Sequence, residues 1–461
     1  MGHSWRPIAP LPSDWEKWVD SELSAIRAVW RDLQEAMGER TAAKVHERML
    51  TEWSIETGMV EDLYRWDRGV TETLLTHGVR ADRIPDGASS WSPELVAQVI
   101  QDQISVVEGL FAYVKEERPI STSFIHELHA QLLRNVPRNY DLGKWKTGSN
   151  WVTLPDGSTH EYCPPEHVAA EMDRLLELNS EYEAKHVPVE IRAAWLHHRF
   201  TQIHPYTDGN GRTARALATL LLVKDHLFPL IIRQSEKHMY FDDLEAADGG
   251  DEGPLIHRFR GLQRREVVKM SVPVPLTPPE NRPPATIQEA LDRVRDKLEY
   301  SERVLPDLWA PLFGKVDALG EEITKQINEL VERLTRSFAT KTGYGFRSVV
   351  KDGDTLGFRP EALDYQPRYA RINKTICLQI AMPVKWRIAC AIHETGPRTN
   401  GLASCVVYLS PPSEELRAVM SSPSEYFLIS YAEPLPDIHA RFSKWLEKQL
   451  INTLDLWQQQ L

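Results

Sequence analysis

Residues 204–215 form a polar turn between two stretches that the sequence predicts as helices. Upstream, residues 189–203 place apolar side chains at helical spacing. Downstream, residues 214–227 are almost entirely apolar and end before Pro229, which cannot continue a helix. The pattern predicts two core helices joined by a short turn that gathers charged and polar side chains.

The turn contains groups that suit a phosphate. Gly209 and Gly211 permit positive φ and let a ligand approach the backbone closely. The following helix directs its unpaired N–H groups and its positive dipole end into the turn. Arg212 and Arg215 are three residues apart, so they share roughly one face and can hold successive phosphates through forked hydrogen bonds. The Gly-Lys-Ser/Thr ending of a Walker loop is missing, so the turn predicts a phosphate site of another kind.

Two further side chains of the turn have catalytic chemistry. His204 ends the upstream helix and can act as a base near neutral pH. Asp208 offers hard oxygen ligands for Mg²⁺, which shares its coordination with phosphate oxygens. The alternative is an ordinary glycine turn between core helices, with its arginines paired to surface carboxylates. We favour a functional site over an ordinary turn because the base, carboxylate, amide, glycines and arginines fall within one turn and its flanks.

The run from His204 to Arg215 resembles the signature of the Fic domain family, His-Pro-Phe-x-Asp/Glu-Gly-Asn-Gly-Arg-x-x-Arg. Tyr206 replaces the phenylalanine, a mild change at an apolar position. The resemblance covers about residues 54–263. It implies an all-helical core and transfer of AMP from ATP to a hydroxyl of a protein target.

The resemblance also implies a role for each residue of the motif. His204 would take the proton from a Ser, Thr or Tyr hydroxyl, and Asp208 would hold Mg²⁺ against the α- and β-phosphates. Arg212 would bind the β-phosphate side and Arg215 the γ-phosphate, so that pyrophosphate leaves. Three further positions would line the hole for the transition-state charge: Gly209, Asn210 and Gly211.

Other functions remain open on the same motif. A nucleotide in a flipped pose would lead to transfer of phosphate or another group, and a glutamate that positions a water would remove AMP. A protein without catalysis could use the motif as a nucleotide sensor and its C-terminal region for partners. The intact motif favours AMP transfer.

A β-hairpin is expected upstream of the motif. Asn150, Trp151, Val152 and Thr153 form a strand-like run, and residues 155–157 read Pro-Asp-Gly, a turn signal. The segment resembles the flap of Fic proteins, which holds the target segment by strand addition. The alternative is a hairpin that only connects two helices.

An inhibitory helix is also expected. Ser92 caps a predicted helix that continues to Glu108 and Gly109. Fic proteins often have a regulatory helix with the pattern Ser/Thr-x-x-x-Glu-Gly/Asn, and the resemblance implies that Glu108 pairs with Arg215 and displaces the γ-phosphate. Ile104 stands where the pattern has a hydroxyl residue. The alternative is a surface glutamate beside a helix-ending glycine.

The chain is expected to be mainly α, with a C-terminal α+β domain after an all-helical Fic core. The predicted segments are an N-terminal helical scaffold (1–88), the Fic core with inhibitory helix, flap and motif (89–271), a proline-rich linker (272–286) and the α+β domain (287–461). In the last segment, strand-like runs between residues 375 and 432 follow a long helical stretch. We expect it to serve partner recognition or dimerisation, so a homo-oligomer is possible.

Charge and cysteine content limit the partners and the compartment. The formal net charge of −12 gives no support to a nucleic-acid partner. The four cysteines lack metal-ligand spacing and fit a reducing compartment. The sequence has no apolar run of membrane-spanning length and no signal-peptide region. We therefore expect a cytoplasmic protein with ATP and a protein target as its partners and no membrane contact.

Overall fold

The computed structural model describes most of the chain as two compact units. The described ranges are 5–36, 39–116, 118–138, 140–153, 159–270, 309–339, 345–352, 367–381, 386–395, 402–410 and 426–459. The helical unit comprises Met1–Val19 and Glu39–Gln263, and the sheet unit comprises Asp20–Gly38 and the described chain from Arg264 onward. The predicted linker (272–286) lies outside the described residues.

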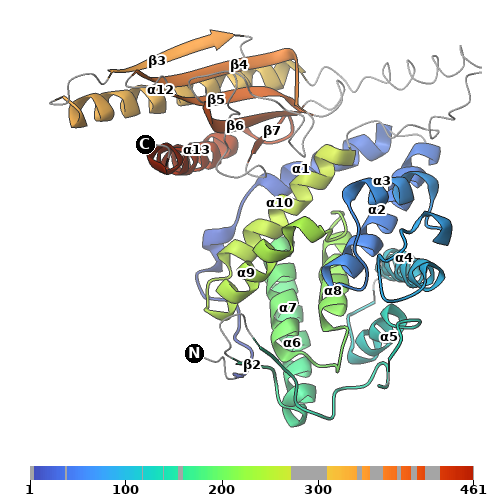
Figure 1. The fold of residues 1–461 in the computed structure, drawn as a ribbon. Helices are drawn as coiled ribbons and strands as arrows, with labels where there is room; N and C mark the ends of the chain where they lie inside the picture. The colour runs from blue at the N-terminus through green and yellow to red at the C-terminus, as the bar shows by residue number, and fades with distance from the viewer. Residues whose placement is uncertain are drawn as a thin grey trace, which may run out of the picture. The chain divides into compact units, whose positions relative to one another are not determined.

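Helices form the helical unit, apart from one two-stranded hairpin (Figure 1). Its α-helices are α2 (Glu39–Val60), α3 (Arg68–His77), α4 (Pro93–Lys115), α5 (Thr122–Leu132), α6 (Pro165–Ala184), α7 (Val189–Ile203), α8 (Asn210–Lys224), α9 (Lys237–Asp248) and α10 (Gly253–Met270), the last of which continues into the sheet unit. Three 3₁₀ turns accompany them: η1 (Trp15–Trp18), η2 (Ala81–Arg83) and η3 (Gln234–Glu236). Strands β1 (Trp151–Thr153) and β2 (Thr159–Glu161) pair antiparallel.

Helices α7 and α8 lie side by side at the centre of the helical unit (Figure 1). Almost all of their side chains are buried, including polar ones such as Arg199 of α7, which pairs with Glu252. Helix α7 has the predicted bounds, 189–203, whereas α8 starts at Asn210, four residues before the predicted start. The reason is that Gly209 takes the left-handed φ of 79° that starts the helix, so both arginines of the motif lie in its first turns.

The sheet unit is an antiparallel five-stranded meander with helices packed on it. The strands follow chain order as β3 (Gly345–Asp352), β4 (Pro367–Ala381), β5 (Trp386–Thr395), β6 (Leu402–Ser410) and β7 (Phe427–Ser430). The helices are α1 (Glu22–Ala36), α12 (Trp309–Ser337) and α13 (Leu435–Gln459).

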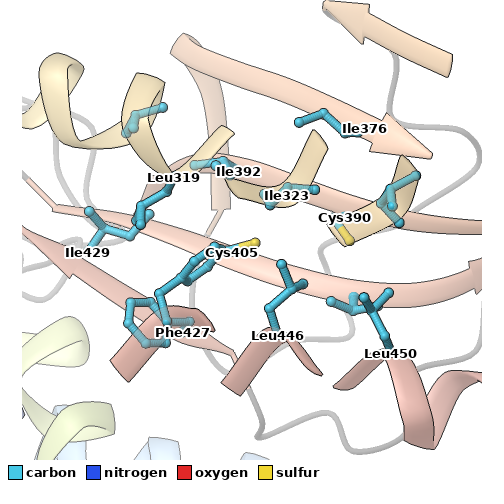
Figure 2. Packing of buried hydrophobic residues seen from close by; sticks show 14 of the residues in the cluster. Leu319, Ile323, Ile376, Cys390, Ile392, Cys405, Phe427, Ile429, Leu446 and Leu450 are labelled. Atoms are coloured by element: carbon cyan, nitrogen blue, oxygen red, sulfur yellow. The ribbon is translucent and has the colours of Figure 1, made fainter. Parts of the chain in front are cut away.

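One face of the sheet holds the core of this unit, as Figure 2 shows. Alternate residues along each strand, such as Cys390 and Ile392 on β5, point to the same side of the sheet, because strand side chains have a period of two. Helix α12 covers this side with Leu319 and Ile323, and α13 adds Leu446. Both helices therefore bury their apolar stripes against one sheet face.

The N-terminal stretch, expected as one scaffold, is split between the units. Helix α1 belongs to the sheet unit, whereas α2 and α3 belong to the helical unit. Polar contacts far apart in sequence hold α1 there: the Ser21 hydroxyl donates to Glu433, and Arg441 lies 3.3 Å from Asp20. Such pairs leave no local pattern in the sequence.

The fold class is confirmed as mainly α, with a small sheet in the second unit. In the part of the chain that the structure describes, no helix is long and apolar enough to cross a membrane.

Candidate active site

The turn from His204 to Gly209 is closed by the side chain of Asn210. The Asn210 amide accepts from the Tyr206 N–H at 2.8 Å and donates to the Tyr206 carbonyl at 2.8 Å. Asn210 is almost fully buried, so its side chain holds the turn and leaves the backbone N–H groups of the α8 N-terminus to face a ligand. Left-handed φ angles at His204 (51°) and Gly209 (79°) bracket the turn.

Aromatic packing fixes Tyr206 beneath the turn. Its ring stacks on His129 with centroids 3.6 Å apart, and its hydroxyl lies 3.1 Å from Nδ1 of His126. The extra hydroxyl, relative to phenylalanine, therefore has a partner in a buried place, where an unpaired one would cost free energy.

His129 fixes the backbone of Asp208. The Gly143 N–H donates to Nδ1 of His129 at 3.0 Å, so the proton of the neutral ring is on Nε2. Nε2 in turn donates to the Asp208 carbonyl at 2.9 Å. Burial lowers the pKa of His129 to about 4, so it is neutral at physiological pH. His126 and His129 thus hold the turn in place through Tyr206 and Asp208.

Three donors hold the Asp208 carboxylate. Tyr140 donates to Oδ2 at 2.6 Å and Arg212 Nη2 lies 3.1 Å from the same oxygen, while the Gly209 N–H donates to Oδ1 at 2.6 Å. Burial raises the pKa of Asp208, but Arg212 and these hydrogen bonds outweigh it, so the pKa is lowered and the group is ionised. No sequence pattern indicates that Tyr140 contacts Asp208.

The donor set at Asp208 fits a cation that also binds phosphate. Among the described residues, no group of three or more His, Cys, Asp or Glu side chains is placed to hold a metal ion. Mg²⁺ usually takes only one or two carboxylates and completes its shell with water and substrate phosphates. An ionised carboxylate at a helix N-terminus that suits phosphate meets that requirement.

Arg212 has hydrogen-bonding capacity left over. The side chain is 1% exposed, and Nη2 contacts Asp208. In the described part of the chain, Nε and Nη1 have no hydrogen-bond partner. A buried guanidinium with unpaired donors is costly, and a phosphate oxygen would satisfy them.

Arg215 is fully engaged within the protein. Its Nε donates to the Thr57 hydroxyl at 2.8 Å, and its Nη2 lies 2.8 Å from Oε1 of Glu61 and 3.1 Å from the Thr57 carbonyl. Burial lowers the pKa of Arg215, but Glu61 and Tyr240 raise it more, so the net shift is upward. A Cβ at Gly211 would lie 2.4 Å from Oε1 of Glu61, so the glycine leaves room for this glutamate.

The expected pairing of Glu108 with Arg215 is wrong. Glu108 is exposed on α4, whereas the carboxylate on Arg215 belongs to Glu61, which directly follows α2. The spacing Thr57-x-x-x-Glu61 was a usable signal, but Asp62 follows where the pattern has glycine or asparagine. Asp62 has a φ of 55°, a left-handed conformation that Gly, Asn and Asp adopt most readily.

His204 is held as a neutral base. Its Nδ1 lies 3.2 Å from the Thr201 carbonyl, which can only accept, so Nδ1 carries the proton and Nε2 is free to take another. The ring stacks on Tyr162. Burial lowers the pKa of His204 to about 4, so the free base dominates at neutral pH.

The predicted hairpin is present as β1–β2. Trp151 and Val152 are 64% and 43% exposed, a high exposure for large apolar side chains. Asn150 points to the motif instead, because its amide donates to the Tyr206 carbonyl at 3.1 Å. Thr153 pairs through its backbone with Thr159.

Comparisons with known proteins find similar sequences for part of the chain. Residues 119–222 match the model of the Fic/DOC family. The chain is 32% identical over 145 residues to a protein adenylyltransferase Fic of Nematostella vectensis, which covers 31% of this chain and 32% of that protein. It is 35% identical over 113 residues to a protein adenylyltransferase Fic of Aedes aegypti, or 23% of this chain and 22% of that one.

Among solved structures, a Fic domain containing signaling protein from Bacteroides thetaiotaomicron is similar, with 23% identity and a TM-score of 0.47 over 54% of this chain and 96% of that one. The sequence matches to the two adenylyltransferases span about a third or less of the length of those proteins. The family match contains His204, Asp208 and both motif arginines. The chain therefore carries a Fic/DOC family domain over residues 119–222.

Proposed function

We propose that this chain transfers AMP from ATP to a Ser, Thr or Tyr hydroxyl of a protein target. One observation carries the proposal: a free base, Nε2 of neutral His204, shares one turn with Arg212, a buried cation with two unpaired donors in the described structure. The curated relatives named adenylyltransferases support the same reaction.

In the proposed step, Nε2 of His204 takes the proton of the target hydroxyl as its oxygen attacks the α-phosphorus. The bond between the α-phosphorus and the bridging oxygen to the β-phosphorus breaks, and pyrophosphate leaves. Backbone N–H groups at the α8 N-terminus and Arg212 face the charge that develops on the phosphates. Positioning and electrostatics account for most of the rate in such transfers.

Asp208 would hold Mg²⁺, which would neutralise negative charge on the phosphates when bound. Tyr140 and Arg212 already orient one oxygen of this carboxylate, so the chain presents it in a fixed position. The role of the protein here is to keep Asp208 ionised and aimed at the phosphates.

Glu61 would restrain the reaction. It occupies Nη2 of Arg215, the arginine that would otherwise bind the γ-phosphate. While the pair persists, ATP cannot use Arg215, so the triphosphate lacks one of its two cationic anchors. An active site forms when Arg215 exchanges Glu61 for phosphate.

The hairpin β1–β2 would bind the target. An extended segment added to a strand edge gains backbone hydrogen bonds, and the exposed Trp151 and Val152 offer apolar contacts beside it. For the compartment, Cys163, a buried cysteine that forms no disulfide in the described structure, supports a reducing cytoplasm.

Labelled ATP tests the proposal. Full-length Glu61→Gly protein is incubated with a cell lysate and ATP labelled at either the α- or the γ-phosphate, and Glu61→Gly combined with His204→Ala serves as the inactive match. We expect α label on protein only with His204 present. Label on protein from the γ position would indicate phosphate transfer. The absence of any label would indicate a nucleotide sensor. Either result would overturn AMP transfer.

A further inference from the structure

We infer that Tyr162 is a positioning residue for His204, which sets the plane of the imidazole and links it to the hairpin β1–β2. The inference rests on the proposed function of His204 as the base. It assigns a role to a side chain that neither the motif nor the flap residues 150–153 include.

The contact between the two rings is close and nearly parallel. The centroids of Tyr162 and His204 lie 3.7 Å apart, with 15° between the ring planes. The hydrogen bond from Nδ1 to the Thr201 carbonyl fixes one edge of the imidazole but leaves the ring free to tilt about that contact. A stacked ring removes this freedom and directs Nε2 away from Thr201.

Tyr162 also ties the base to the hairpin. It directly follows β2, and its N–H donates to the Asn150 carbonyl at 3.3 Å, which closes the hairpin where its two strands begin and end. Asn150 in turn donates to the Tyr206 carbonyl. Both ends of the hairpin therefore contact the turn: Asn150 contacts its backbone, and Tyr162 stacks on the His204 ring. The position of the hairpin and the direction of Nε2 are thus coupled.

The charged groups around His204 come from several elements. Lys146 before β1 and His160 of β2 disfavour the protonated ring, whereas Glu61 after α2 and the Thr201 carbonyl of α7 favour it. Burial exceeds all of these and lowers the pKa. The Tyr162 ring covers one face of the imidazole, so its removal admits water and returns the pKa toward its usual value near 6.5.

The test compares Tyr162→Phe, which keeps the stack, with Tyr162→Ala, which removes it. The His204 pKa is measured in the full chain by hydrogen–deuterium exchange at Cε1, because the tryptic peptide 200–212 contains His204 and no other histidine. Rates of AMP transfer are measured against pH and ATP concentration in a Glu61→Gly background.

We expect Tyr162→Phe to retain the low pKa and most of the rate. In Tyr162→Ala we expect a higher pKa of His204, a pH profile whose acid limb moves to higher pH, and a loss of up to about 100-fold in kcat, the cost of a misdirected group. The KM for ATP should be unchanged. An unchanged pKa and kcat in Tyr162→Ala would overturn the inference, as would a Tyr162→Phe variant as impaired as Tyr162→Ala.

The two proposals fail in different ways. If the wild-type and Glu61→Gly proteins both transfer no AMP, the proposed function fails, whereas the exchange measurement still reports whether Tyr162 holds the His204 ring. If transfer occurs and depends on His204 but not on the Tyr162 ring, only the positioning role fails.

Discussion

Glu61 and Arg215 form an ion pair inside the helical unit, with Oε1 and Nη2 2.8 Å apart. The arginine is almost fully buried and the glutamate is about three-quarters buried. Thr57, one helical turn before Glu61, holds the same guanidinium through its hydroxyl and its carbonyl. The last turn of α2 and the residue that follows this helix therefore hold the second arginine of the motif through a hydroxyl, a carbonyl and a carboxylate.

Removal of this glutamate should activate the protein. In Glu61→Gly, Arg215 is free to bind the γ-phosphate, and we expect modification of the protein itself, measured with α-labelled ATP, to rise on the order of 10-fold. Glu108→Gly is the matched control, because Glu108 is exposed on α4 and should leave the rate unchanged. Equal rates in Glu61→Gly and wild type would contradict the restraint.

The same variant should also change how ATP affects stability. Without Glu61, the buried guanidinium of Arg215 keeps Thr57 but loses its carboxylate partner, so the melting temperature should fall in the absence of nucleotide. ATP then supplies the missing anion. We expect the rise in melting temperature with ATP to be larger in Glu61→Gly than in wild type, and a smaller rise would count against a phosphate on Arg215.

The contribution of His204 to AMP transfer can be separated from nucleotide binding. His204→Ala should lower AMP transfer by at least about 10²–10⁴-fold, the usual contribution of a positioned base. Nucleotide binding, followed by calorimetry in the Glu61→Gly background, should persist, because the anion site is built from α8 and its arginines. A variant that keeps full activity would remove His204 from the mechanism.

The sequence predicted the helices around the turn better than the partner of Arg215. The bounds of helix α7 follow from local spacing, whereas the roles of His204 and Arg212 stay predictions. Glu61 was missed because its partner lies 154 residues away and because Asp62 replaced the expected glycine. No local rule could have assigned Tyr140 or Tyr162, since each acts on a residue brought near only by the fold.

The sheet unit shows the same limit. The alternation of β4 to β7 was visible in the sequence, but β3 was not. The place of α1 beside these strands depends on pairs such as Ser21 with Glu433, which are 412 residues apart. Periodicity predicts an element and its buried face, whereas long-range polar partners decide where that element packs.

Acid should destabilise the fold through His129. Its pKa is about 4 when folded and near 6.5 when unfolded, so below pH 6.5 the unfolded chain binds the proton and the folded chain does not. The free energy of unfolding is therefore highest above pH 6.5 and should fall by about 2 kcal/mol between about pH 7 and pH 5 from this group. Urea unfolding at several pH values measures the fall.

His129→Gln provides the control for that prediction. Glutamine can accept from Gly143 and donate to the Asp208 carbonyl but does not titrate in this range. The variant should be less stable than wild type at neutral pH and should have a flatter pH dependence. An equal slope in both proteins would mean that His129 contributes nothing to the acid sensitivity.

The carboxylate of Asp62 should tune the restraint by Glu61. Asp62 has a left-handed φ of 55° and pairs with Lys237 of α9 and with Arg65, at 2.8 Å for the latter. Hydrogen bonding to Lys237 lowers its pKa, and burial does not reverse this, so the group is charged at neutral pH. These pairs fix the residue that directly follows Glu61, and they are partly exposed, so salt should weaken them.

Asp62→Asn separates charge from backbone shape, since asparagine adopts the left-handed conformation as readily. We expect its modification rate to lie between those of wild type and Glu61→Gly, with less dependence on salt than in wild type. Lys237→Gln should behave in the same way, because it removes the other half of the pair. If both variants match wild type at low ionic strength, the position of Glu61 is set by Thr57 and Arg215 alone.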